Sequence, residues 1–328
     1  MLYSISKRIE VQAKPLRYPL SGHYDGKRFF NPNAPQAKGL LDVLRWKMTS
    51  RTAPWTPRTQ PASPASVPPA SVGGTRCRIT WINHSTVLIQ YAGTNLITDP
   101  IWSERASPLS WIGPRRFSPP GVLFENLPKI DLVLLSHNHY DHLDVPTLQR
   151  IASRDAPRFL VPLGLRKLLS RHGMHAEREM DWWDTAGPIT CLPARHFSAR
   201  GVTDRNRTLW CSYWIATAAG PVYFAADTAF APHFAEIHNG LGSPRVALLP
   251  IGAYKPEWFM SPVHMSPGEA VEAHRILSPE RSIAIHWGTF QLADDAADEA
   301  VAVLQTALSR YPDLPPFDVL ESGAGIEL

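Results

Sequence analysis

Short apolar runs alternate with helical patterns along the chain from Thr75 onward. Short apolar runs bounded by polar residues predict buried strands, and apolar positions spaced three and four residues apart predict amphipathic helices. The predicted strands are 86–90, 132–135, 222–225, 246–251 and 282–285, and the predicted helices are 145–153, 164–172, 267–277 and 295–311. Strands mixed with covering helices indicate an α/β layered domain.

One predicted helix has a well-defined start. Ser266 stands at the N-cap position, Pro267 at the first helical position, and Glu269 three residues after the cap. This spacing is a capping box, in which each side chain bonds the backbone N–H of the other residue. We therefore expect the helix to begin at Pro267.

The first 74 residues differ from the rest. The stretch 51–74 is rich in Pro, Ala, Ser and Thr, which predicts a linker or a surface extension. We therefore divide the chain into an extension with a Pro-rich linker (1–74) and one domain (75–328).

The extension also contains an apolar stripe at helical spacing, made of Leu40, Leu41, Leu44 and Met48. It predicts a short helix packed on the main domain. The alternative is a helix lying on a membrane surface, since basic residues and Trp46 flank the stripe.

Composition narrows the class of protein. With 44% hydrophobic residues in 328, the chain can bury a sizeable core, and its net charge of +4 suits an anionic substrate or surface. Its three cysteines, Cys77, Cys191 and Cys211, have no metal-ligand spacing, which predicts a reducing compartment, the cytoplasm. We expect neither a membrane-spanning helix nor a signal peptide, because the apolar runs are too short.

The strongest chemical signal is the segment His137-Asn-His139-Tyr-Asp141-His142, which directly follows a predicted strand. Histidines two positions apart on an extended backbone point the same way, so His137 and His139 can share one metal. Asp141 and His142 lie past the turn and can reach a second metal. Imidazole and carboxylate groups suit Zn²⁺.

Three further candidates occupy the same context. His196, Asp227 and His286 each follow an apolar strand-like run. Any one of them alone is more often a capped or solvated residue, but together with the first segment they supply the seven ligands of a two-metal site. We expect one metal to bind His137, His139 and His196, the other to bind Asp141, His142 and His286, and Asp227 to bridge them.

The His-x-His-x-Asp-His pattern resembles the signature of the metallo-β-lactamase superfamily. The segments 136–144, 224–228, 250–260 and 285–290, with 24–26 and 29–32, resemble the phospholipases D that hydrolyse N-acylphosphatidylethanolamine and their bacterial relatives. The resemblance implies a four-layer αββα sandwich, two zinc ions and the ligand roles above. Ala226 and Ala229 depart from it, since they stand where glycines are expected.

Two divalent ions about 3.5–4 Å apart lower the pKa of a shared water to about 7 and neutralise the charge of a phosphodiester. Class B β-lactamases place a cysteine in the second metal site, whereas this chain offers Asp227, so we expect poor β-lactamase activity. Asp141 and His264 are the candidate catalytic residues; His264 can assist the leaving group or bind phosphate. For His264, a surface loop histidine is the alternative.

Candidates for substrate contact are Tyr254, Trp258 and Trp287, with core packing as the alternative for the tryptophans. His84 is a candidate for a place near the site. Asp99 is a candidate partner for a ligand histidine, with a turn-forming role before Pro100 as its alternative.

Three functions remain open from the sequence. The first is a zinc-dependent phosphodiesterase of the phospholipase D type, acting on a phospholipid and touching the membrane peripherally. The second is a hydrolase of a lactone or of a non-lipid phosphodiester. The third is a non-catalytic metal- or nucleic-acid-binding module, which the full ligand set disfavours. Arg200, Arg205 and Arg207 near Trp210 hint at nucleic acid, but an arginine loop over a phosphate substrate explains them equally, and we expect no nucleic-acid partner.

Overall fold

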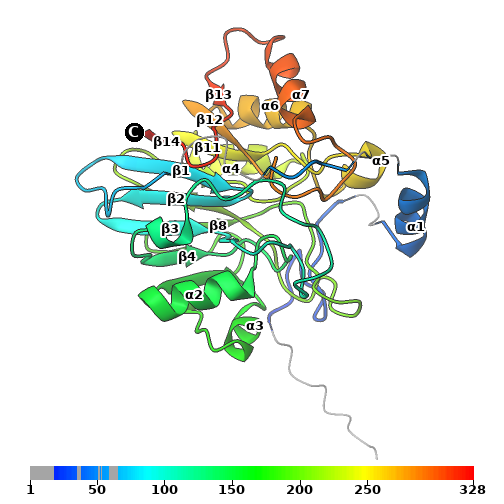
Figure 1. Cartoon of the computed structure of the whole chain (residues 1–328), viewed down its shortest axis with the longest axis horizontal. Coiled ribbons are helices and arrows are strands. Elements are labelled where there is room, and N and C mark those ends of the chain that lie inside the picture. The colour runs from blue at the N-terminus through cyan, green and yellow to red at the C-terminus, as the bar shows by residue number, and fades with distance from the viewer. Residues whose placement is uncertain (1–17, 35–37, 51, 53, 59–65) are drawn as a thin grey trace, which may run out of the picture.

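The computed structural model describes residues 18–34, 38–50, 52, 54–58 and 66–328. Two seven-stranded mixed sheets pack face to face (Figure 1). The first sheet has the order β14-β1-β2-β3-β4-β5-β6. Its strands are β1 (Cys77–Asn83), β2 (Thr86–Tyr91), β3 (Thr94–Thr98), β4 (Leu132–Leu134), β5 (Arg158–Pro162), β6 (Arg178–Met180) and β14 (Gly325–Glu327).

The second sheet has the order β13-β12-β11-β10-β9-β8-β7. Its strands are β7 (Thr185–Ala186), β8 (Ile189–Leu192), β9 (Ser212–Ile215), β10 (Val222–Phe224), β11 (Val246–Pro250), β12 (Arg281–Ile285) and β13 (Phe317–Asp318). The five predicted strands correspond to β2, β4, β10, β11 and β12.

Helices cover the outer face of each sheet (Figure 1). α2 (Val145–Asp155) and α3 (Arg166–Arg171) cover the first sheet, and α4 (His233–Leu241), α6 (Pro267–Leu277) and α7 (Glu299–Leu308) cover the second. One buried apolar cluster fills the space between the sheets, and two others join the sheets to their helices. This is the four-layer αββα sandwich that the family resemblance implies. The remaining helical segments are α1 (Leu40–Thr49), α5 (Glu257–Met260) and a 3₁₀ turn (Phe124–Asn126).

The capping box of α6 forms as predicted. The Glu269 backbone N–H donates to Ser266 Oγ at 3.3 Å, and the Ser266 N–H donates to Glu269 Oε2 at 2.8 Å. α7 begins four residues later than predicted, at Glu299. The predicted start, Asp295, instead accepts a hydrogen bond from the Ala253 N–H and ties this loop to the loop after β11.

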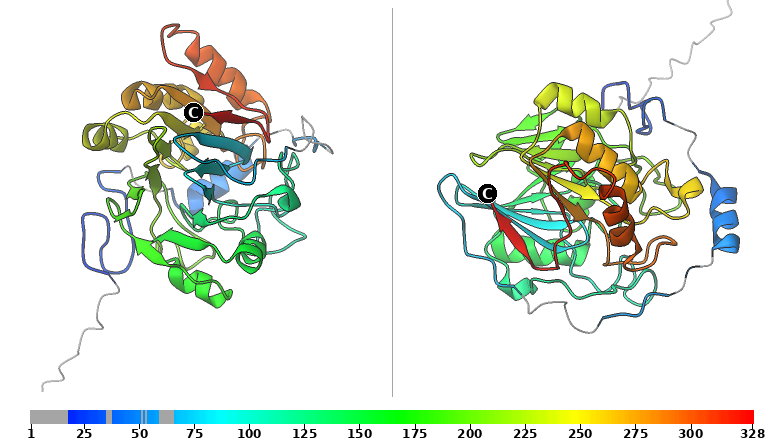
Figure 2. Two further views of the ribbon diagram at one scale, coloured as in Figure 1. Left: turned by 90° about the vertical axis from the view of Figure 1, so that its left-hand side faces the viewer. Right: turned by 90° about the horizontal axis from the view of Figure 1, so that it is seen from above.

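α1 packs on the main domain with a different face from the predicted one. Trp46 stacks on Phe259 with ring centroids 4.9 Å apart. Leu41, Leu44 and Met48 remain 80%, 48% and 79% exposed, so the prediction that their stripe packs on the domain is wrong. The Leu40 side chain lies outside the described residues. Stacking buries the large Trp46 ring, which offers more apolar contact than the aliphatic stripe. Figure 2 shows α1 at the margin of the molecule.

Part of the predicted linker is fastened to the first sheet. Gln90 Nε2 donates to the Pro69 carbonyl and Asn95 Nδ2 donates to the Ala70 carbonyl, both at 2.8 Å. Residues 66–74 therefore lie against β2 and β3, which follows the surface-extension alternative for this stretch. The two buried amides that hold them come from the sheet, so local composition does not reveal the attachment. Residues 59–65 of the predicted linker lie outside the described ones. Among the described residues, no helix is long and apolar enough to cross a bilayer.

Candidate metal centre

Strand ends from both sheets meet at one edge of the sandwich. The candidate residues there are His84 after β1, Asp99 after β3, His137, His139, Asp141 and His142 after β4, His196 after β8, Asp227 after β10 and His286 after β12. Because the carboxyl ends of these strands converge, side chains distant in sequence gather at one point. All of these residues except His139 are buried.

Left-handed backbone is concentrated at these strand ends. His84, Asp99, Ala226, Ala253 and His286 have φ between 35° and 59°. Non-glycine residues rarely adopt this conformation, and those that do cluster at functional sites. The left-handed conformation turns the chain sharply where each of these strands ends. Ala226 stands where the resemblance predicts a glycine, and its φ of 53° explains why a glycine suits that position.

His137, His139 and His196 form the first group, as expected from the sequence. His139 Nδ1 lies 2.8 Å from His137 Nε2 and 3.1 Å from His196 Nε2. Burial, with the charge of the neighbouring histidines, holds the pKa of His137 well below its usual range, and burial lowers the pKa of His139 to about 4. Burial likewise holds the pKa of His196 well below its usual range, so the three rings are neutral at pH 7 and turn nitrogens toward a common point, as metal ligands do.

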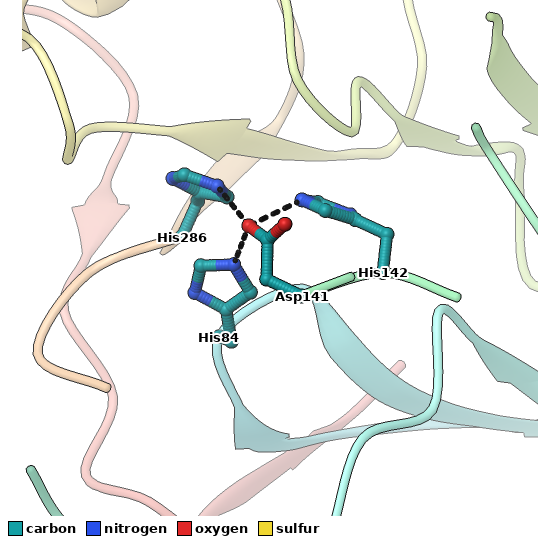
Figure 3. A group of neighbouring side chains, drawn as sticks. All are labelled: His84, Asp141, His142 and His286. Carbon is teal, nitrogen blue, oxygen red and sulfur yellow. Dashed lines mark hydrogen bonds and ion pairs between the residues drawn. The ribbon is translucent and has the colours of Figure 1, made fainter. Parts of the chain in front are cut away.

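The second group surrounds the carboxylate of Asp141 (Figure 3). Asp141 Oδ2 lies 3.2 Å from His142 Nε2 and 3.6 Å from His286 Nε2. His84 joins them, with its Nε2 2.9 Å from the same oxygen. The sequence places His84 near the site without assigning it to a metal. Its position directly after β1 is the signal that would have added it to the group.

Asp227 connects the two groups. Its Oδ2 lies 3.1 Å from His286 Nε2 and 3.2 Å from His142 Nε2, both in the second group. The same oxygen is 3.8 Å from His196 Nε2 in the first group. One carboxylate oxygen therefore stands between the two sets of imidazoles.

Hydrogen bonds behind the site orient the imidazoles. His142 Nδ1 donates to Asp99 Oδ2 at 2.8 Å, and Asp99 accepts two more bonds from the N–H and hydroxyl of Ser136. His196 Nδ1 donates to the Val263 carbonyl at 2.9 Å. Because Nδ1 of His142 and of His196 is hydrogen-bonded, the Nε2 atom of each ring faces the centre. Metal-ligating histidines usually donate their second ring N–H to a carboxylate or a carbonyl in this way.

The centre has the donor set of a cation site. Burial opposes protonation of His286, but the carboxylates of Asp227 and Asp141 outweigh it and raise its pKa to about 9. Among the described residues, His142 Nε2, His286 Nε2 and Asp227 Oδ1 are buried without a hydrogen-bond partner. Each such atom costs about 1–3 kcal/mol. A divalent cation would satisfy these atoms, and nitrogen and carboxylate donors fit zinc.

His264 lies at the edge of the centre. Its Nδ1 is 4.0 Å from Asp227 Oδ2 and has no hydrogen-bond partner among the described residues. Burial lowers the pKa of His264 to about 4. With Tyr254, whose buried hydroxyl also lacks a partner, His264 lines a cavity of about 240 Å³. Two of the sequence candidates therefore share one cavity next to the centre.

The two tryptophan candidates lie elsewhere. Trp287 stacks on Trp81 with ring centroids 5.1 Å apart and packs against the core between the layers. Trp258 is 37% exposed and lies under the guanidinium of Arg45 from α1, 4.8 Å from its ring centre. The structure therefore does not bring Tyr254, Trp258 and Trp287 into one pocket. For Trp287, the structure favours the alternative interpretation, in which the side chain packs against the core.

Comparison with known proteins concerns the family and the fold of the chain. A family described as a beta-lactamase superfamily domain matches residues 94–287, more than half of the chain. The chain is similar to an N-acyl-phosphatidylethanolamine-hydrolyzing phospholipase D from Caenorhabditis elegans, with 39% identity over 65% of this chain and 64% of the relative. A mitochondrial phospholipase D of the same description from Saccharomyces cerevisiae is 33% identical over 68% of this chain and 50% of its own length. The chain thus spans less than two thirds of both relatives.

A solved structure shows the same fold. A metallo hydrolase from the archaeon Ignicoccus hospitalis superposes with a TM-score of 0.57 and 24% identity. The match covers 77% of this chain and 99% of the archaeal chain. At this level of identity the likeness concerns the fold.

Proposed function

The chain belongs to the beta-lactamase superfamily of metal-dependent hydrolases, and from this premise we propose that it is a binuclear zinc phosphodiesterase of the phospholipase D type. The observation that carries the proposal is the position of Asp227 Oδ2 between the two histidine groups. A carboxylate shared between two sets of imidazoles suits a pair of ions.

One zinc would be held by the first group and the other by Asp141, His142 and His286, and Asp227 would contribute to both sites. His84 then donates from Nε2 to Asp141 Oδ2 and orients that carboxylate. Burial, with the charge of His286, lowers the pKa of His84 to about 3, so the ring is neutral and keeps the N–H that this bond requires.

When bound, a pair of zinc ions would supply the activation of water and the neutralisation of phosphodiester charge. The protein holds the imidazoles in place through Asp99 and the Val263 carbonyl. His264 is neutral at pH 7 and can donate one N–H to a phosphate or leaving-group oxygen. Tyr254 lines the same cavity and offers its hydroxyl to a polar group of the substrate.

A lipid of the N-acylphosphatidylethanolamine type is the substrate we favour, because both phospholipase D relatives are described by it. The exposed face of α1 supports peripheral membrane contact. Leu41, Leu44 and Met48 are exposed to solvent there. Arg45 of the same helix places its guanidinium over the ring of Trp258. Exposed aliphatic side chains flanked by cations suit the interface of an anionic membrane.

The second candidate is a hydrolase of a small polar ester, either a lactone or a non-lipid phosphodiester. The cavity beside His264 favours it, because about 240 Å³ lined by Glu257, Ser261, Ser266 and Glu269 would not enclose acyl chains. This candidate keeps the two-zinc site and changes only the substrate.

One assay panel separates the candidates. The zinc-loaded protein is given a long-chain and a short-chain N-acylphosphatidylethanolamine, bis-nitrophenyl phosphate and a lactone. We expect kcat/KM to rise with acyl length, since each buried methylene contributes about 0.8 kcal/mol, and the nitrophenyl diester to be cleaved slowly. Lactone turnover with neither type of diester cleaved would remove the phosphodiesterase proposal and leave the hydrolase.

A further inference from the structure

A basic groove lies on the outer side of the loop that carries the candidate ligands. Its volume is about 700 Å³. We define the basic groove by six of its lining residues: Asn138, Tyr140, Lys167, Arg171, Arg200 and Arg207. Lys167 and Arg171 come from α3, while Arg200 and Arg207 come from the loop between β8 and β9.

The basic groove is separate from the candidate metal centre. Asn138 and Tyr140 line it, whereas the residues that alternate with them, His137, His139 and Asp141, turn into the centre. None of the candidate ligands lines the groove. One loop therefore has the ligands on one side and the groove on the other.

The cations of the groove outnumber its carboxylates, because Lys167, Arg171, Arg200 and Arg207 stand against Asp144 and Asp204. Lys167, Arg171 and Arg207 are exposed, and among the described residues none of them pairs with a carboxylate. The acidic residues of the groove are already bonded. Asp144 accepts hydrogen bonds from Ser103 and Thr147, and Asp204 accepts from backbone N–H groups of its own loop.

Two further groups give the groove a fixed polar wall. The Arg200 guanidinium donates from Nη1 to the Asn138 and Leu143 carbonyls and lies 3.8 Å from the centre of the Tyr140 ring. This anchoring holds a cation in the wall. Asn138, which is only 3% exposed, adds a polar amide to the same wall.

We propose that the basic groove binds a phosphate group at a second site, apart from the metal centre. Several cations around one concave surface, including rigid guanidinium groups, are the chemistry that recognises phosphate. The phosphate can belong to an anionic phospholipid headgroup or to a soluble phosphate ester. The rim favours the lipid: Ser107 and Pro108 line the groove, and the loop they begin exposes Leu109, Trp111 and Ile112.

Charge reversal tests the groove directly. We compare the zinc-loaded wild type with Lys167→Glu/Arg171→Glu by co-sedimentation with phosphatidylcholine vesicles, with and without phosphatidic acid. Titrations of both proteins with inorganic phosphate and glycerol 3-phosphate measure the binding of soluble phosphates. Each cation near an anionic lipid surface contributes about fivefold to binding, so losing two weakens binding to the acidic vesicles by at least about thirtyfold.

The matched control is Lys129→Glu/Arg310→Glu, which makes the same change in net charge at exposed positions outside the groove. We expect the control to change binding by less than about threefold. Arg207→Gln provides a milder variant at the groove, with an expected loss of about fivefold. Binding to acidic vesicles alone identifies the lipid source, whereas binding to the soluble phosphates identifies the phosphate group itself.

The proposal is overturned if the wild type binds none of these ligands, or if both double variants lose binding equally. The test reads binding without turnover, and Lys167→Glu/Arg171→Glu leaves every candidate ligand of the metal centre unchanged. Asp227→Ala is expected to retain binding in the groove, so failure of the metal centre and failure of the groove are distinguishable.

Discussion

Asn31 Nδ2 donates a hydrogen bond to the backbone carbonyl of His196 at 2.8 Å, while Asn31 Oδ1 accepts one from Trp210 Nε1 at 3.1 Å. The N-terminal segment therefore reaches across 165 residues of sequence to hold a candidate zinc ligand. Phe29 anchors the segment, because it is buried in a small cluster with Trp210. Residues 18–34 thus help to support the candidate metal centre, although the sequence assigns them to an extension.

Replacing Asn31 with Ala should weaken zinc binding about tenfold, because outer hydrogen bonds of ligand histidines contribute about 10–100-fold to metal affinity. A competitive chelator titration measures this. Asn239→Ala, at an exposed position in α4, serves as the control and should leave zinc affinity unchanged. Equal affinities in the wild type and Asn31→Ala would show that Asn31 does not position His196.

Asp227→Ala should remove most of the bound metal and the activity. We expect about two zinc ions per wild-type chain and fewer than one in the variant, because one oxygen of Asp227 faces both histidine groups. Elemental analysis of protein never exposed to chelator measures both contents. Asp313→Ala, at an exposed position, is the control. Only trace metal in the wild type would refute the assignment.

Ala226→Gly should change the free energy of unfolding by less than about 1 kcal/mol. Relief of the left-handed backbone at φ 53° offsets the larger unfolded-state entropy of glycine and the loss of a buried methyl. Ala225→Gly gains no such relief and should cost more, about 1–2 kcal/mol. Denaturant unfolding compares the two. A larger cost at residue 226 than at residue 225 would contradict the strain at Ala226.

Acid should destabilise the fold through His233. Burial, with the charge of Arg195, lowers its pKa from 6.5 to about 3. Below pH 6.5 the unfolded chain therefore binds a proton that the folded chain rejects, so stability falls as pH drops from about 6.5 towards 3. At pH 4.5 this single group costs about 2–3 kcal/mol.

The test for His233 is urea unfolding at pH 7 and at pH 4.5. His233→Gln retains a donor for Thr228 Oγ1, which the histidine Nε2 contacts at 3.2 Å, and removes the titration. The loss of stability between the two pH values should be about 2–3 kcal/mol smaller in the variant. An unchanged pH dependence would show that His233 does not carry this effect.

Much of the sandwich could be predicted because its strands are short, apolar and bounded by polar loops, and because the α6 start carries a capping box. The strand β1 escaped prediction, since Arg78 and Thr80 interrupt its apolar pattern. His84 was consequently not recognised as a strand-end residue of the site. For α1, periodicity identified a stripe but could not show that Trp46 would find Phe259 as its partner. Long-range contacts of this kind are not encoded in local spacing.

The order in which the chain is synthesised bears on how it acquires metal. The first histidine group cannot be completed before His196 leaves the ribosome, and the second must wait for His286. The last strand, β14, then pairs with β1, the first strand of its sheet. The first group can therefore close once His196 has been made, whereas the second stays open until His286 has been made. The two candidate ion sites are consequently completed in a fixed order during synthesis, the first group before the second.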